Sequence, residues 1–148
     1  MRFSFLIIMI LSGTIMHAQD ITHIGCRRVV GYIIPKEVQL LPESNRFTPS
    51  VDDIIKAEII LRQRKLKDES QQLTIKMIGN KYIRQYVGYI SDSNNKEILI
   101  ILTKKGIIKD EKRFKSFITF LDGGKNHWQV KVDIDNNQIK DIEINVPG

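Results

Sequence analysis

The sequence is poor in the side chains on which enzymes most often rely. It contains one cysteine, Cys26, and three histidines, His17, His23 and His127. A single thiol excludes a disulfide within the chain, so packing has to stabilise the fold. We expect Cys26 to be a buried, inert thiol rather than half of an intermolecular bridge. The histidines do not stand at the spacing of metal ligands, and we predict no metal site, no cofactor and no catalytic residue.

A hydrophobic run long enough to cross a bilayer as a helix is also missing. The longest apolar stretch covers residues 3–16, which is short of the ~20 residues that a transmembrane helix needs. It follows Arg2 and leads to Ala18, a small residue suited to the position before a cleavage site. This pattern predicts a secretory signal peptide over residues 1–18. We expect an exported protein, periplasmic or secreted, that begins at Gln19 and has no transmembrane anchor.

The end of this apolar stretch bears on lipidation. Leu11-Ser12-Gly13 resembles the start of a bacterial lipobox, in which the next residue is the cysteine that takes the lipid. Here that residue is Thr14, and a hydroxyl cannot form the thioether. We therefore expect no lipid anchor.

Basic residues outnumber acidic ones, with 23 Lys and Arg against 17 Asp and Glu, a formal charge of +6 at pH 7. Removing residues 1–18 would take away only Arg2 and leave +5. An excess of this size permits contact with anionic partners without selecting one. We expect an envelope protein or an anionic glycan or lipid as partner, and not nucleic acid.

A helix is predicted that starts at Thr48-Pro49-Ser50 and runs to about Lys67. Thr48-Pro49-Ser50 offers an N-cap hydroxyl and a proline suited to the first turn, and Asp52 and Asp53 lie where they meet the helix dipole. Apolar side chains fall within one arc of this helix, which predicts the face that packs on the core: Val51, Ile54, Ile55, Ile59 and Leu61.

Two charged residues, Glu58 and Arg62, interrupt the apolar arc. An ion pair between them at the rim of the helix would contribute only a few tenths of a kcal/mol. If Glu58 is buried, it needs a cation from the sheet, because a buried charge without a partner is strongly destabilising. We predict that Arg84 supplies that cation.

The other predicted elements are strands. Residues 27–34 predict a short strand that Pro35 ends. From Tyr82 onward the apolar residues alternate, and turn-forming clusters separate strands predicted at 82–90, 97–103, 117–121, 128–135 and 142–146. Every residue from Ile98 to Leu102 is apolar, which is typical of a strand covered on both faces or lying centrally in the sheet.

This order of elements predicts an α+β fold. One long helix is followed by a meander of four or five antiparallel strands, and wrapping the sheet around the helix buries both apolar faces, as in cystatin-like and NTF2-like proteins. We expect an N-terminal strand and loop over residues 19–46 and an α+β domain over residues 47–148, all of 19–148 forming one globular domain.

A further indication comes from motifs spread over residues 47–146. These motifs are Phe47-Thr48-Pro49 leading into Ala57-Glu58, Lys81-Tyr82-Ile83-Arg84-Gln85-Tyr86-Val87-Gly88-Tyr89, Leu121-Asp122-Gly123-Gly124, and Ile144-Asn145-Val146. Their combination resembles a family of small exported bacterial proteins, many of them lipoproteins. The chain departs from it at Thr14 and in ending Asn145-Val146-Pro147-Gly148. The resemblance implies bacterial export and a compact α+β domain, and it carries no activity.

Two sets of residues could bind a partner. Tyr82 and Tyr86 share one face of a predicted strand and could form a stacking surface, with Tyr89 on the opposite face, although aromatic residues on strands commonly pack. Residues 104–115 form a basic connection whose cations could bind an anion or remain ordinary solvated charges: Lys104, Lys105, Lys109, Lys112, Arg113 and Lys115.

Other motifs have structural explanations. We interpret His127 as a surface residue at a strand start, Asp133 and Asp135 as the solvated face of a strand, and Asp122-Gly123-Gly124 as a turn. The segment 85–88 comes near the protease-binding Gln-x-Val-x-Gly hairpin of cystatins, but we expect it inside a strand.

The sequence therefore favours a non-enzymatic binding or interaction module, in which a sheet face or the basic connection meets a partner. The alternative is an NTF2-like small-ligand-binding protein or enzyme. Its pocket would lie between helix and sheet, lined by Glu58, Arg84 and tyrosines.

Overall fold

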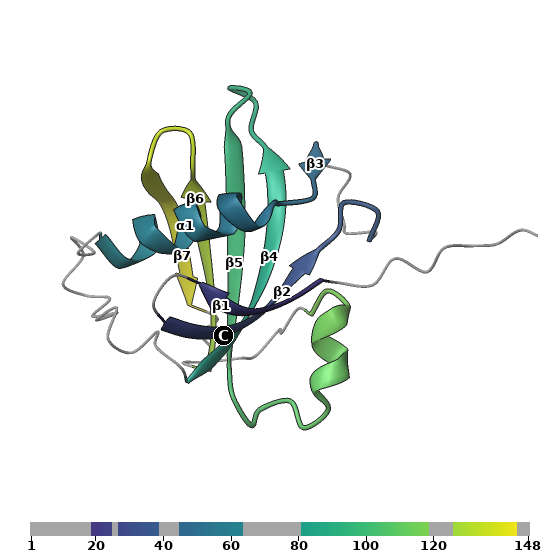
Figure 1. Ribbon diagram of the computed structural model, residues 1–148. Coiled ribbons are helices and arrows are strands. Elements are labelled where there is room, and N and C mark those ends of the chain that lie inside the picture. Colours follow the sequence, from purple (N-terminus) through teal and green to yellow (C-terminus); the bar gives the residue numbers. More distant parts are fainter. Residues whose placement is uncertain (1–18, 25–26, 39–44, 64–80, 119–125, 145–148) are drawn as a thin grey trace, which may run out of the picture.

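The computed structural model describes residues 19–24, 27–38, 45–63, 81–118 and 126–144. Within these ranges one α-helix packs on an open, mostly antiparallel sheet (Figure 1), which confirms the predicted α+β class. The elements are β1 (Gln19–Ile24), β2 (Arg27–Ile34), β3 (Arg46–Phe47), α1 (Val51–Gln63), β4 (Tyr82–Ile90), β5 (Lys96–Lys104), the 3-10 helix η3 (Glu111–Lys115), β6 (His127–Asp133) and β7 (Gln138–Ile144). The predicted signal peptide, Cys26 and the Asp122-Gly123-Gly124 turn lie outside the described residues.

The sheet has the strand order β1-β2-β4-β5-β6-β7, and β3 also pairs with β4. Strands β4 to β7 form the predicted antiparallel meander. The N-terminal strands extend the meander, because β2 pairs with β4 in parallel along Gly31 to Ile34. Parallel neighbours need a long crossover connection, and the chain segment that contains α1 provides it. The sheet is therefore larger than the four or five strands predicted, and it is not purely antiparallel.

A reciprocal cap starts α1. The Ser50 hydroxyl accepts from the Asp53 N–H at 3.2 Å, and the Asp53 carboxylate accepts from the Ser50 N–H at 2.9 Å. Such an exchange satisfies two backbone donors that a helix start leaves open. The cap is thus Ser50, with Pro49 before the helix rather than in its first turn.

The buried face of α1 differs from the predicted one. Val51 and Ile59 are 42% and 45% exposed, whereas Ala57 and Ile60 are buried together with Ile54. The buried arc is therefore rotated by roughly a quarter turn from the predicted stripe. In this orientation small Ala57 faces the sheet, and Glu58 reaches Arg84 on β4.

The sheet separates two apolar cores. The first lies under α1, where Ile54, Ala57, Ile60 and Leu61 meet residues of β2, β4, β5 and β6 and Ile134 just after β6. The second lies on the opposite face and is closed by residues of the connection between β5 and β6, green in Figure 1: Ile108, Phe114 and Ile118. Strand β5 serves both, since Ile100 joins the first core and Ile101 the second. This agrees with the prediction for residues 98–102, since β5 lies centrally between β4 and β6 and only Leu99 among these residues is partly exposed.

Two polar residues predicted at the surface are buried. His127 is 1% exposed because β6 places it opposite Thr103 of β5, whose hydroxyl lies 3.1 Å from its Nδ1 atom. Burial lowers the pKa of His127. Asp133 is 0% exposed and accepts from the N–H groups of Asp135 and Asn136, so it organises the turn from β6 to β7. Burial raises the pKa of Asp133, but hydrogen bonds from Asn136 outweigh it and hold that pKa low.

The last described strand, β7, exposes Lys140, Asp141 and Glu143. Its pairing with β6 shifts register between Lys131 and Val132, which marks a β-bulge or a similar irregularity. The strand predicted at 117–121 does not begin where expected, because Phe117 and Ile118 follow η3 as irregular chain. No helix in the described residues is long and apolar enough to span a membrane.

Candidate functional site

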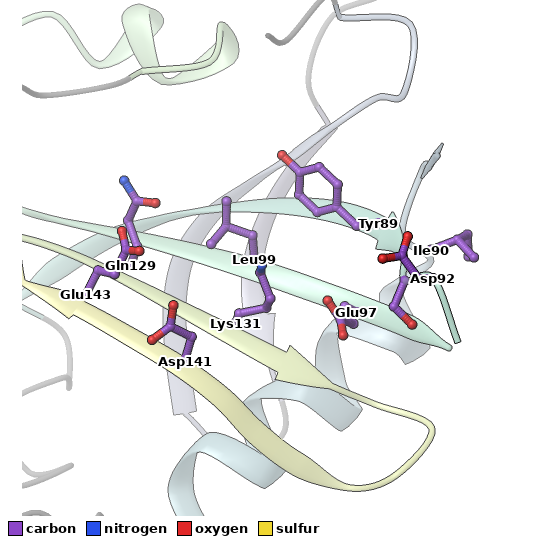
Figure 2. A pocket seen from close by; sticks show the side chains of 10 residues that line it. Tyr89, Ile90, Asp92, Glu97, Leu99, Gln129, Lys131, Asp141 and Glu143 are labelled. Atoms are coloured by element: carbon purple, nitrogen blue, oxygen red, sulfur yellow. The ribbon is translucent and has the colours of Figure 1, made fainter. Parts of the chain in front are cut away.

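An open groove of about 540 Å³ lies on the sheet face away from α1 (Figure 2). Its walls come from the end of β4, the following turn, and strands β5, β6 and β7. The lining residues are Tyr89, Ile90, Ser91, Asp92, Glu97, Leu99, Gln129, Lys131, Asp141 and Glu143.

Strand register explains why these side chains meet. Alternate residues of a strand point to the same face, and the pairing aligns such residues across β4 to β7. Lys131 stands between Leu99 of β5 and Asp141 of β7. Gln129 is opposite Glu143, and Tyr89 is opposite Glu97. The floor of the groove is therefore formed by side chains that lie next to one another on neighbouring strands.

The groove is open because the connection after β5 covers only part of this sheet face. Gln85 of β4 holds that connection in place, since its amide donates to the carbonyl groups of Phe114 at 2.8 Å and Ser116 at 2.6 Å. Its oxygen accepts from the Ile118 N–H at 3.2 Å. For residues 116–118, these hydrogen bonds provide the backbone partners that a neighbouring strand would otherwise provide. They keep the connection over β2 and β4, next to Tyr32, whose ring stacks on Phe114 at 5.9 Å.

Tyr89 forms the aromatic wall. Its ring is half-buried, and the Arg46 guanidinium lies 5.9 Å from the ring centroid. Arg46 is fixed in turn by donating to the carbonyl oxygen of Pro35 at 3.1 Å. Burial raises the pKa of Tyr89, and the nearby Arg46 charge opposes that shift only in part. The phenol therefore stays neutral near pH 7 and can donate or accept a hydrogen bond.

The groove carries an excess of negative charge. Four carboxylates and one ammonium line it, a net formal charge of −3 on a protein whose overall charge is +6. Asp92 and Glu97 lie at the β4–β5 end, and Asp141 and Glu143 lie on β7. A concave surface lined by one sign of charge raises the local concentration of the opposite ion. Sequence reasoning did not single out these carboxylates, although the alternation of Asp141 and Glu143 along the last strand was visible.

The structure brings Glu58 and Arg84 together in the first core. Arg84 Nε lies 2.9 Å from Glu58 Oε1, and the Tyr86 hydroxyl donates to the same oxygen at 3.0 Å. Arg62 lies farther, at 3.7 Å from the other carboxylate oxygen. Glu58, Arg84 and Tyr86 are at most 3% exposed. Burial, and next the Glu58 charge, raise the pKa of Tyr86 well above its ordinary value.

The residues proposed for stacking face α1 rather than solvent. Tyr86 is 0% exposed, so a ligand has no access to its ring. Tyr82 is half-buried and packs against the first core. The segment 85–88 lies inside β4, as predicted, and not at a hairpin tip.

The six cations of the basic connection are all exposed, and none of them lines the groove. No group of three or more His, Cys, Asp or Glu side chains that could hold a metal ion occurs among the described residues.

No protein-family model, no curated protein and no solved structure matches the chain significantly. The chemistry of the groove therefore rests on its own residues.

Proposed function

We propose that the protein is an exported, non-enzymatic binding module that holds a ligand with two separated alkylammonium groups, such as a linear polyamine, in the groove on the sheet. The net charge of −3 across the groove is the observation that carries this proposal. Export rests on the predicted signal peptide and on the resemblance to small exported bacterial proteins. The helix followed by the meander β4–β7 supports a cystatin-like or NTF2-like layout.

The carboxylates form two pairs at opposite sides of the groove. Glu97 lies on β5 and Asp141 on β7, two strands apart and offset by two residues along the strands, which corresponds to about 12 Å. Between them lie apolar Leu99 and Lys131, and the stem of a lysine is itself apolar. Two ammonium groups of one ligand can therefore each meet a carboxylate pair while methylene groups lie over Leu99.

Lys131 allows a test in which one variant should gain affinity, because the ammonium group of Lys131 repels the cations of the ligand. We expect Lys131→Gln to strengthen spermidine binding, and the double variant Asp141→Asn/Glu143→Gln to weaken it at least tenfold. Asp52→Asn is the matched control, since this exposed carboxylate lies on α1 at the other face of the sheet. Isothermal titration calorimetry at low salt measures the spermidine affinity of the unmodified protein and of the three variants.

The proposal fails if spermidine does not bind the unmodified protein in the millimolar range, or if Asp52→Asn weakens binding as much as the double variant does. Hexylamine, which has a single ammonium group, should bind more weakly than spermidine by at least tenfold. Equal affinities would contradict the two-site arrangement.

The alternative pocket between α1 and the sheet has less support. Of its predicted lining, Glu58, Arg84 and Tyr86 are at most 3% exposed and engaged in the contacts described above, and Tyr82 packs against the first core. A ligand could reach these groups only if α1 moved away from the sheet.

A further inference from the structure

The basic connection, residues 104–115, presents its charges on an anchored segment. Ile108 and Phe114 are 7% and 1% exposed and belong to the second core. Gln85 holds the end of the segment through the Phe114 carbonyl group. At its start, the Lys105 N–H donates to the Lys81 carbonyl oxygen at 2.9 Å. The cations between these anchors are therefore displayed on a fixed scaffold rather than on a free loop.

An apolar side chain projects among these cations. Ile107 is 47% exposed, although Ile108 beside it is buried. Gly106 has a φ angle of +87°, a conformation that other residues rarely adopt. The Ile107 N–H closes the turn on the Lys104 carbonyl oxygen at 3.3 Å. The turn thus places an isoleucine at the surface between Lys105 and Lys109.

The charge of the connection is strongly one-sided. Six cations stand against Asp110 and Glu111, and the Asp110 carboxylate is already used to cap η3 by accepting from the Lys112 N–H at 3.1 Å. All six cationic residues are exposed, and Lys81, which is also exposed, adjoins the start of the segment. Clusters of four to eight such cations are typical of surfaces that bind anionic lipid head groups.

We propose that the basic connection docks on the surface of an anionic lipid bilayer, with its cations at the head groups and Ile107 entering the interface. The exposed isoleucine favours a bilayer over an acidic glycan, because only the bilayer provides an apolar environment directly behind its charges. This surface is separate from the groove, so the two proposals can fail independently.

The test measures co-sedimentation of the full-length protein with vesicles. One set contains phosphatidylglycerol and phosphatidylcholine, and the other contains phosphatidylcholine alone. We expect binding to the anionic vesicles that weakens with salt. Each cation near such a surface changes the affinity by about fivefold, so Lys105→Gln/Lys109→Gln/Lys112→Gln should lower it by about 100-fold. Lys56→Gln, an exposed lysine on α1, is the matched control and should change it by less than twofold.

Ile107→Ser separates a bilayer from other anionic partners. We expect it to lower the affinity for anionic vesicles several-fold and to leave binding to soluble heparin unchanged. Equal vesicle binding by Ile107→Ser and the unmodified protein would overturn the proposal in favour of an acidic polymer. Equal losses in the triple variant and in Lys56→Gln would also overturn the proposal, because the cations of the connection would then have no special role. The apolar residues 3–16 are the same in all variants, and binding to vesicles of phosphatidylcholine alone measures their contribution.

Discussion

Replacing Glu58 by glutamine removes the buried charge while preserving the shape of the side chain. The Arg84 guanidinium is 3% exposed and would lose the carboxylate 2.9 Å away. Breaking a buried pair in this way costs about 3–5 kcal/mol. Arg84 keeps its bond to the Tyr82 carbonyl group at 3.1 Å, and a glutamine oxygen can still accept from Tyr86. We therefore expect the lower end of that range, about 3 kcal/mol.

Urea unfolding measures this loss, followed by the fluorescence of the single tryptophan, Trp128, on β6. With a slope of about 2 kcal/mol per molar urea, the midpoint should fall by about 1.5 M. Lys96→Gln is the matched control. It breaks an ion pair with Asp53 at 3.6 Å in which Lys96 is 47% exposed, and such pairs contribute at most about 1 kcal/mol.

Two results would refute the reasoning. One is a midpoint shift for Glu58→Gln no larger than that for Lys96→Gln. The other comes from the double variant Glu58→Gln/Arg84→Met, which contains neither buried charge and should recover part of the lost stability. A double variant less stable than Glu58→Gln would show that the arginine charge was not the source of the loss.

Two further predictions concern the face of the sheet away from α1. The pKa of His127 is lowered in the fold, so the unfolded chain takes up a proton more readily and stability falls as pH drops below about 6.5. His127→Asn can keep the hydrogen bond to Thr103 and should remove the part of the pH dependence that comes from His127. A difference in stability between this variant and the unmodified protein that stays constant between pH 7 and pH 5 would contradict the prediction. Gln85→Leu should leave the Phe114 carbonyl group and the Ile118 N–H without their partner, at about 1–3 kcal/mol each. Trypsin should then cut the basic connection faster in native buffer, and an unchanged cleavage rate would show that Gln85 does not hold it.

Local patterns in the sequence were sufficient to predict the meander. The alternation of Trp128, Val130 and Val132 indicates strand β6 and its apolar face. Asn136-Asn137 indicates the hairpin turn, and Asn137 has a φ angle of +58° there. The parallel pairing of β2 with β4 could not be predicted in this way. Its partners are about 50 residues apart, and no local pattern records which strand edge a distant segment will occupy.

The surfaces were harder to predict than the strands. The alternation along β6 turns Gln129 and Lys131 away from the apolar face. Whether they are covered depends on where the connection after β5 folds back, and that depends on the buried amide of Gln85. The burial of His127 likewise depends on Thr103 of the neighbouring strand. In both cases a tertiary partner decides the environment of a polar side chain.

The charged side chains of β7 have a consequence beyond ligand binding. The last strand of an open sheet offers unpaired N–H and C=O groups on which another extended chain can add, and this is a common route to aggregation. On β7, Lys140, Asp141 and Glu143 are exposed and the pairing with β6 is irregular. A second copy adding to this edge would have to bury these charges partly and pair along a distorted ladder. The carboxylates that give the groove its charge thereby also protect the protein from polymerising through its open edge.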